Sequence, residues 1–250
     1  MSMTLEAIRA AHARIAPYIV PTPLLRLPAL DDALGCEVYV KAECMQRTGA
    51  FKLRGAMNKI LALTDAERGA TMVPPFNDEL VMAGQGTVGL EIMAQCPEID
   101  AVVVPVSGGG LIGGVSTAVK ALAPRVRVFG AEPAALPRYT ASLRAGHPVQ
   151  VEQKRSIADA LVAQTPGDVC FPYVAAHTDG FADVADADIL RGMKLLLLEG
   201  KLLCEPSSAI GIGAALRGQF PVRRGDKVCF VISGGSVALE QLHQLEDVAL

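Results

Sequence analysis

The chain of 250 residues contains no tryptophan, and aromatic residues make up only 4% of it. Its charges sum to -3 and are interspersed along the chain, which argues against a nucleic-acid or anionic-membrane partner. No apolar stretch reaches the roughly 20 residues that span a bilayer. Residues 1–16 mix acidic and basic side chains, unlike a signal peptide. These absences predict a cytoplasmic protein without a membrane partner.

Cysteine and histidine are present but lack the spacings of metal sites. The six cysteines are scattered without a C-x-x-C pair, which favours reduced thiols over disulfides or zinc. The four histidines show no ligand spacing. No G-x-S-x-G, H-E-x-x-H or paired-carboxylate pattern occurs, so the sequence argues against serine hydrolases and metalloproteases.

Apolar runs alternate with glycine turns and amphipathic segments. We predict strands at 37–41, 101–106, 126–131 and 227–232, and helices at 4–15, 52–63, 79–95, 111–122, 136–145, 186–198, 207–216 and 237–245. Asp78 and either Asp186 or Asp188 are candidate helix N-caps. The pattern predicts an α/β fold in one domain over residues 1–250, with a parallel twisted sheet and helices on both faces.

Lys52 is the first candidate for chemistry, because it lies where a helix should begin behind the turn at Gly49. A lysine in the first turn of a helix is most often a surface residue. Here Phe51 and Leu53 supply apolar neighbours, and the positive end of the helix dipole opposes a cation. Both effects favour the neutral amine, which is the nucleophilic form.

The loop Ser107-Gly108-Gly109-Gly110 follows a buried strand and opens a helix at Leu111. Backbone amides without side chains in such a place can all point at one anion. The alternative is an ordinary strand-to-helix turn. An amine nucleophile and an anion cradle are the two halves of a pyridoxal phosphate site, with Lys52 forming the Schiff base.

Three further segments end or follow predicted elements. Ser233 follows the last strong strand, where its hydroxyl can bond a ligand's ring nitrogen or simply belong to a turn. Ser207 or Ser208, after Glu205, is more simply explained as a helix cap. Glu132 ends a strand and is either a ligand-facing acid or a turn acid.

Taken together, these segments resemble the serine/threonine dehydratase and serine racemase branch of the fold-type II (tryptophan synthase β-like) pyridoxal phosphate enzymes. The motifs that carry the resemblance run along nearly the whole chain: 19–24 (IVPTPL), 41–43 (KAE), 48–56 (TGAFKLRGA), 83–87 (AGQGT), 107–110 (SGGG), 131–133 (AEP), 157–159 (IAD), 205–206 (EP) and 233–235 (SGG). The resemblance implies pyridoxal 5'-phosphate as cofactor, an amino acid as substrate and a homo-oligomer, most simply a dimer.

The resemblance also implies roles for individual residues. Lys52 would carry the cofactor and act as acid and base at the α-carbon. The cofactor-binding set would be Lys52, Phe51, Phe76, Ser107, Gly108, Gly109, Gly110, Leu111, Glu205 and Ser233. Phe51 and Phe76 would flank the cofactor. Ser233 would face the ring nitrogen, and a neutral hydroxyl there would leave the ring unprotonated.

The chain departs from the family pattern in three places. The Ser-x-Gly-Asn-His loop, which grips the substrate carboxylate, is missing, and the chain passes near 64–71 to a segment that the family reaches only after most of its small lobe. Arg138 stands where an aspartate of a divalent-metal site is expected, so we predict no metal. Ala160 replaces a glycine after Asp159. The large lobe with remnants of a truncated small lobe is therefore expected.

The resemblance implies an ammonia-lyase (dehydratase) that converts L-serine, L-threonine or a related β-hydroxy amino acid to a keto acid and ammonia. Two alternatives stay open. One is a shortened cofactor-binding relic or engineered large lobe with little turnover, and the other is an amino-acid racemase.

Overall fold

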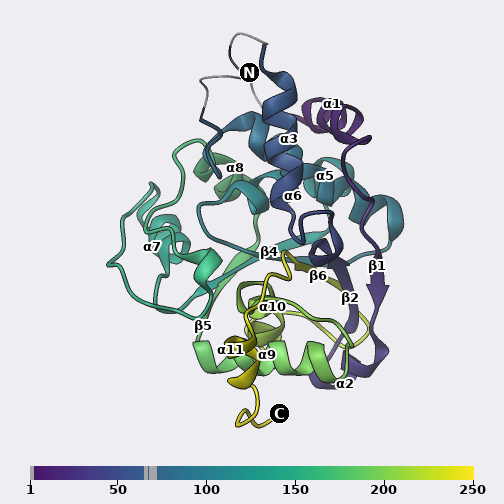
Figure 1. Cartoon of the computed structure of the whole chain (residues 1–250), viewed down its shortest axis with the longest axis vertical. Coiled ribbons are helices and arrows are strands. Elements are labelled where there is room, and N and C mark those ends of the chain that lie inside the picture. Colours follow the sequence, from purple (N-terminus) through teal and green to yellow (C-terminus); the bar gives the residue numbers. More distant parts are fainter. Residues whose placement is uncertain (1–2, 65–66, 68–71) are drawn as a thin grey trace.

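The computed structural model describes residues 3–64, 67 and 72–250. Within these residues its centre is one sheet of six strands in the order β1-β2-β6-β3-β4-β5 (Figure 1). The strands are β1 (Leu24–Arg26), β2 (Glu37–Ala42), β3 (Ala101–Pro105), β4 (Arg127–Pro133), β5 (Gly180–Val184) and β6 (Lys227–Ile232). Only the pair β1–β2 is antiparallel among these described strands. The α/β prediction with a parallel sheet is confirmed.

Helices cover both faces of the sheet (Figure 1). One apolar core joins the sheet to α2 (Asp31–Leu34), α9 (Asp186–Leu198) and α10 (Pro206–Leu216). The other core joins it to α5 (Glu79–Gln95), α6 (Gly110–Leu122) and α8 (Phe171–His177). Along β3, Val103 belongs to the first core and Val102 to the second. Central strands read as continuous apolar runs because both of their faces are buried.

Three further helices complete the two layers. Both α1 (Leu5–Ile15) and α3 (Lys52–Ala62) pack against α5. Beside β5 lies α7 (Arg138–Ala145), and α11 (Leu239–His243) lies near the C-terminus. Short 3-10 turns occupy Pro28–Leu30, Glu43–Met45 and Asp159–Leu161.

Short elements escaped the sequence prediction. The edge strand β1 has three residues, α2 has four and α8 has seven, too few for a periodic pattern. The strand β5 was missed because Gly180 and Asp183 interrupt its apolar character. The last helix, α11, is shorter than the predicted 237–245. The predicted junction at 64–71 falls mostly on residues 65–66 and 68–71, which lie outside the described part of the chain.

The predicted helix caps had mixed outcomes. Asp78 caps α5, and its side chain accepts a hydrogen bond from the Val81 amide. The prediction that Asp186 or Asp188 caps α9 is wrong, because Ala185 holds the N-cap position. The Asp186 carboxylate instead accepts from the Ser156 hydroxyl at 2.6 Å. Long-range pairing outweighs the local cap preference here.

Two further predictions from the sequence concern membrane-spanning helices and cysteine thiols. Across the described ranges, no helix combines the length and the apolar character needed to cross a membrane. The cysteines are free thiols, and four of them are buried, namely Cys36, Cys170, Cys204 and Cys229. Burial raises the pKa of Cys36 to about 11, so this thiol stays protonated at neutral pH.

Candidate active site

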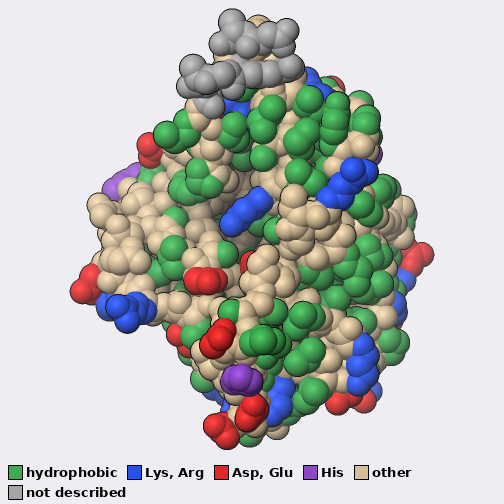
Figure 2. Space-filling model, viewed as in Figure 1, with side chains coloured by type: hydrophobic (Ala, Val, Ile, Leu, Met, Phe, Trp, Pro, Cys, Tyr) green, Lys and Arg blue, Asp and Glu red, His purple; other side chains and the backbone are tan. Residues whose placement is uncertain are grey.

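A cavity of about 600 Å³ opens at the carboxyl edge of the sheet, where β3 and β6 end. Its size falls in the range of small-molecule sites, and the carboxyl edge is where open α/β sheets bind ligands. Figure 2 shows this face of the molecule as hollowed between the two helical layers, with a basic side chain lying across the hollow. The walls include Lys52, Phe51, Phe76, Ser107, Gly108, Gly109, Gly110, Leu111, Glu205 and Ser233. The structure therefore brings every predicted cofactor-binding residue to one cavity.

The turn before Lys52 is attached to the segment that follows β6. The Phe51 amide donates to the Ser233 carbonyl at 3.0 Å, and the Gly235 amide donates to the Gly49 carbonyl at 2.9 Å. Ala50 and Gly234 form an isolated antiparallel bridge. These backbone bonds set the start of α3 against the end of β6, so Lys52 and Ser233 line one cavity although they are far apart in the sequence.

Lys52 is exposed to solvent. The prediction that apolar neighbours remove water from this amine is therefore wrong for the chain as it stands: Phe51 and Leu53 are only half-buried beside it. The exposure also means that a ligand in the cavity can reach the amine without any rearrangement of the core.

The glycine loop is packed tightly from two sides. Gly109 has a φ of 105°, in the left-handed region, and a Cβ there would lie 1.8 Å from the Tyr139 hydroxyl oxygen. A Cβ on Gly108 would lie 2.3 Å from the ring of Phe76. Only glycine fits both positions. The loop then opens α6, whose first amides have no partner inside the helix and face an anion well.

Two oxygen atoms of the loop, one carbonyl and one hydroxyl, accept hydrogen bonds from neighbouring segments. The Gly108 carbonyl accepts from the Tyr139 hydroxyl at 3.1 Å and from the Gly167 amide at 2.9 Å. The Ser107 hydroxyl oxygen accepts from the Ala163 amide at 3.3 Å. Tyr139 was not among the predicted site residues, since nothing in its local sequence signals that its hydroxyl supports a loop thirty residues away.

Two aromatic rings border the cavity. Phe76 packs against Gly108 and Gly110, and Phe51 lies at the start of α3. Both rings are half-buried. The prediction that they flank a cofactor agrees with these positions and stays a prediction.

Glu205 occupies the N-cap position of α10. Burial raises the pKa of its carboxyl group, and the positive charge of Lys52 opposes this shift. The prediction that Ser207 or Ser208 caps this helix is wrong, because both lie inside its first turn after Pro206. The Ser207 hydroxyl oxygen accepts from the Ala160 amide at 3.0 Å, and the Ser208 hydroxyl contacts Ser233 at 2.9 Å.

Glu132 and Arg138 form a buried pair behind the loop, and both are fully inaccessible. The Glu132 carboxylate accepts from the Tyr139 and Thr140 amides at the start of α7, at 2.9 and 2.8 Å. Glu132 thus accepts hydrogen bonds from amides at the start of α7, and it is not among the residues that line the cavity. Burial raises its pKa to about 7 despite these two donors.

The Arg138 guanidinium links three segments. It donates to the carbonyls of Leu136 at 3.1 Å, Val106 at 3.4 Å and Leu161 at 2.9 Å, and it lies 3.8 Å from the Glu132 carboxylate. Val106 precedes the glycine loop, and Leu161 lines the opposite wall of the cavity. Among the described residues, no group of three or more His, Cys, Asp or Glu side chains is arranged to hold a metal.

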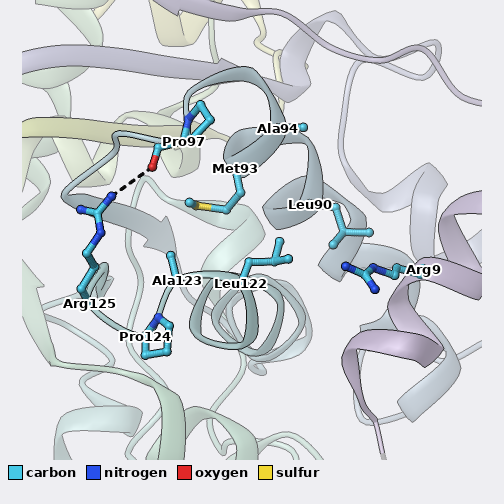
Figure 3. Close-up of a pocket in the computed structure, with 9 residues that line it drawn as sticks. All are labelled: Arg9, Leu90, Met93, Ala94, Pro97, Leu122, Ala123, Pro124 and Arg125. Carbon is cyan, nitrogen blue, oxygen red and sulfur yellow. Dashed lines mark hydrogen bonds between the residues drawn. The ribbon is translucent and has the colours of Figure 1, made fainter.

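A second, larger cavity of about 920 Å³ lies between the C-terminal ends of α5 and α6 (Figure 3). Its walls are mostly apolar, with Arg9 at one side and Arg125, which donates to the Pro97 carbonyl at 3.2 Å, at the other. It has no nucleophile or acid among its lining residues. The smaller cavity around Lys52 is therefore the candidate active site.

Comparison with known proteins identifies the family of this chain. The family model of "Pyridoxal-phosphate dependent enzyme" matches residues 15–69 and 62–234. The chain is 32% identical to "L-threonine ammonia-lyase" of Thermotoga maritima, with 97% of this chain and 78% of the relative covered. It is 33% identical to "Serine racemase" of Oryza sativa subsp. indica, with 94% and 91% covered.

Solved structures give the same picture. Maize serine racemase superposes with a TM-score of 0.92 at 32% identity, covering 98% of this chain and 97% of the other. The fold, the cofactor class and the dehydratase-type ancestry predicted from the motifs are confirmed. The chain belongs to the family of pyridoxal-phosphate dependent enzymes, in the fold-type II group that contains threonine dehydratases and serine racemases.

Proposed function

We propose that this protein is an ammonia-lyase that acts on L-serine, L-threonine or a related β-hydroxy amino acid and releases a keto acid and ammonia. The observation that carries the proposal is the single cavity in which Lys52, the glycine loop and Ser233 meet. Relatives named as threonine ammonia-lyases support the reaction class.

The residues present fit pyridoxal phosphate. The amides at the start of α6 suit its phosphate, the Lys52 amine suits its aldehyde, and the Ser233 hydroxyl suits its ring nitrogen. When bound, the cofactor supplies an electron sink for bond breaking at the amino acid's α-carbon. Lys52 would hold the cofactor and then move the α-proton. Glu205 lines the same cavity and interacts electrostatically with Lys52.

We also propose that most of the small lobe is absent from this chain. The alignment with the Thermotoga relative runs over 314 positions, more than the 250 residues available here. The family model is matched in two segments that overlap at residues 62–69. In the structure, α3 ends at Ala62 and α5 begins at Glu79. The exposure of Lys52 follows naturally if a covering segment is missing.

Two alternatives to the ammonia-lyase follow from other observations. Without residues to grip the substrate carboxylate, positioning is lost and turnover falls by orders of magnitude, which supports a cofactor-binding relic. Relatives named as serine racemases support a racemase, since return of the α-proton competes with elimination.

Product analysis separates the three activities. We expect the purified chain, loaded with pyridoxal phosphate, to form pyruvate from L-serine or 2-oxobutyrate from L-threonine, detected with a lactate dehydrogenase couple. Formation of D-serine without keto acid, detected by chiral chromatography, would favour the racemase. A yellow protein that yields neither product would favour the relic. A protein that takes up no cofactor would contradict the proposed function itself.

The Arg138 guanidinium should make cofactor binding independent of any metal ion. We expect that EDTA or added Mg²⁺ leaves cofactor binding by the native chain unchanged, because the Arg138 guanidinium already joins Leu136, Leu161 and Glu132. Replacing it by alanine should weaken cofactor binding at least about tenfold and leave carbonyl and carboxylate oxygens, the ligands that Mg²⁺ and Ca²⁺ prefer. Added Mg²⁺ or Ca²⁺ should then restore part of the affinity.

The measurement is a titration with cofactor followed by absorbance. Arg144→Ala is the matched control, since Arg144 is exposed on the same helix. If the native chain loses cofactor binding in EDTA, Arg138 does not take the place of a metal ion.

A further inference from the structure

Tyr139 is a buried residue of α7 that contacts the glycine loop without lining the cavity. Its side chain is fully inaccessible, and its hydroxyl donates to the Gly108 carbonyl at 3.1 Å. The residues that line the cavity include Gly108 and Gly109 but not Tyr139. Any effect of this hydroxyl on a bound ligand must therefore pass through the loop.

Two aromatic rings and a carboxylate fix the position of Tyr139. Its ring stacks on Phe181 of β5, with 5.3 Å between the ring centroids and 6° between the planes, and on Phe171 of α8 at 6.4 Å. The Glu132 carboxylate accepts from its amide at 2.9 Å. Burial raises the pKa of the Tyr139 hydroxyl, so it stays protonated at neutral pH. A ring held in this way keeps its hydroxyl directed at the Gly108 carbonyl.

The planar peptide bond between Gly108 and Gly109 carries this contact to the next amide. In a trans peptide the carbonyl and the following N–H point in opposite directions. The Gly108 carbonyl accepts from Tyr139 and also from the Gly167 amide at 2.9 Å, and neither donor is among the residues that line the cavity. The Gly109 N–H therefore points away from both donors, on the cavity side of the loop.

The Gly109 amide is the first of four consecutive donors that remain available to a ligand. Among the residues that the structure describes, the amides of residues 109–112 donate to no protein oxygen, as expected where a loop opens a helix. All four residues line the cavity. A Cβ on Gly109 would lie 1.8 Å from the Tyr139 hydroxyl oxygen. The tyrosine can therefore approach the loop this closely only because residue 109 is a glycine.

We infer that Tyr139 is a positioning residue that orients the Gly109 amide toward the phosphate group of the cofactor, so that its hydroxyl sets how strongly this chain prefers pyridoxal phosphate over pyridoxal. The inference rests on the proposed function, because it takes that phosphate as the anion which the loop binds. A donor that is already oriented binds an anion more tightly, since no ordering cost remains at the moment of binding. Without the tyrosine hydroxyl, the Gly108 carbonyl keeps only the Gly167 amide as a donor, and the peptide is held less firmly.

The test compares two ligands in Tyr139→Phe, which keeps the buried ring and removes the hydroxyl. The full chain, freed of cofactor, is titrated with pyridoxal phosphate and with pyridoxal, and binding is followed by absorbance. We expect the affinity for pyridoxal phosphate to fall about tenfold, the usual effect of losing one hydrogen bond in a buried place. The affinity for pyridoxal, which has no phosphate, should stay unchanged, so the preference between the two ligands shrinks by the same factor.

Tyr173→Phe is the matched control. Tyr173 lies on α8, its hydroxyl donates to Glu79 at 2.6 Å, and it is not among the residues that line the cavity. This variant should bind both ligands as the native chain does. Equal losses for the two ligands in Tyr139→Phe, or no loss for either, would overturn the inference and leave the proposed function intact. If the native chain binds neither ligand, the proposed function fails together with the inference.

A measurement on the native chain decides the question if Tyr139→Phe does not fold. In the ¹⁵N-labelled native chain, inorganic phosphate alone and pyridoxal phosphate should each shift the NMR signal of the Gly109 amide. The amide of Gly146, which is exposed at the end of α7, serves as the reference and should not move. A Gly109 signal that moves with neither ligand would overturn the inference.

Discussion

Replacing Lys52 by alanine should abolish covalent attachment of the cofactor and reduce turnover by about three orders of magnitude or more. The amine is the only lysine among the residues that line the 600 Å³ cavity. The measurement is borohydride reduction of the yellow protein, followed by mass spectrometry of its peptides. In the native chain the added mass should lie on the peptide that contains Lys52, and the variant should carry none.

Lys59→Ala is the control for this experiment. Lys59 lies on the same helix, its amine pairs with the Asp78 carboxylate at 2.7 Å, and neither residue is among those that line the cavity. This variant should keep both the colour and the labelled peptide. A Lys52→Ala protein that is still labelled, on any other lysine, would show that the wrong amine has been chosen. Weak noncovalent binding by the variant is expected, because the glycine loop and Ser233 remain.

Replacing Arg54 by methionine should lower the free energy of unfolding by about 3–5 kcal/mol, the cost of breaking a buried ion pair from one side. Arg54 donates to Glu43 at 2.8 Å and to Glu91 at 2.7 Å, and both it and Glu43 are fully inaccessible. Lys41 donates to Glu91 at 2.6 Å. Loss of the guanidinium leaves two buried carboxylates facing one lysine.

Urea unfolding measures this loss, with Arg26→Met as the control. Arg26 pairs with Asp31 at the surface, where both side chains are about 30% exposed, and such pairs contribute about 0–1 kcal/mol. Equal destabilisation by the two substitutions would contradict the role of the buried cluster. Because Arg54 lies in the same first helical turn as Lys52, its variant should also bind the cofactor less tightly.

The same cluster predicts how stability depends on acid. Burial acts to raise the pKa of Glu91, but hydrogen bonds from His12 and Arg54 outweigh it and lower this pKa to about 2. The ordinary value is 4.5, so the stabilising contribution is fully present above pH 4.5 and is lost as the pH falls toward 2. The native chain should lose stability across this range, and Arg54→Met should lose less of it.

Local patterns predicted much of the fold and part of the site. The strand and helix positions agree closely because burial imposes periodicities that the sequence carries itself. Lys52, Ser107–Gly110 and Ser233 were singled out because each stands at the end or start of a predictable element. The cap assignments at Asp186 and Ser208 failed, since these side chains bond residues that are distant in the sequence.

The exposure of Lys52 also could not be predicted. Its neighbours Phe51 and Leu53 are apolar, but exposure depends on which segments cover the start of α3 in space. The buried Arg54 cluster is a similar case. A charged residue two positions after an exposed lysine gives no sign of its burial, which requires partners from β2, α5 and the turn at Glu43.

The sequence by itself determined most of the longer elements and singled out Lys52 and the Ser107–Gly110 loop, because backbone preferences and apolar spacing are local properties. Only the tertiary structure decided that β6 lies between β2 and β3, which sets Ser233 beside Lys52. It also decided that Ser208 lies behind Ser233 and Arg138 behind the glycine loop. These pairings depend on strand order and register, which a chain adopts only when distant segments bury one another's apolar faces.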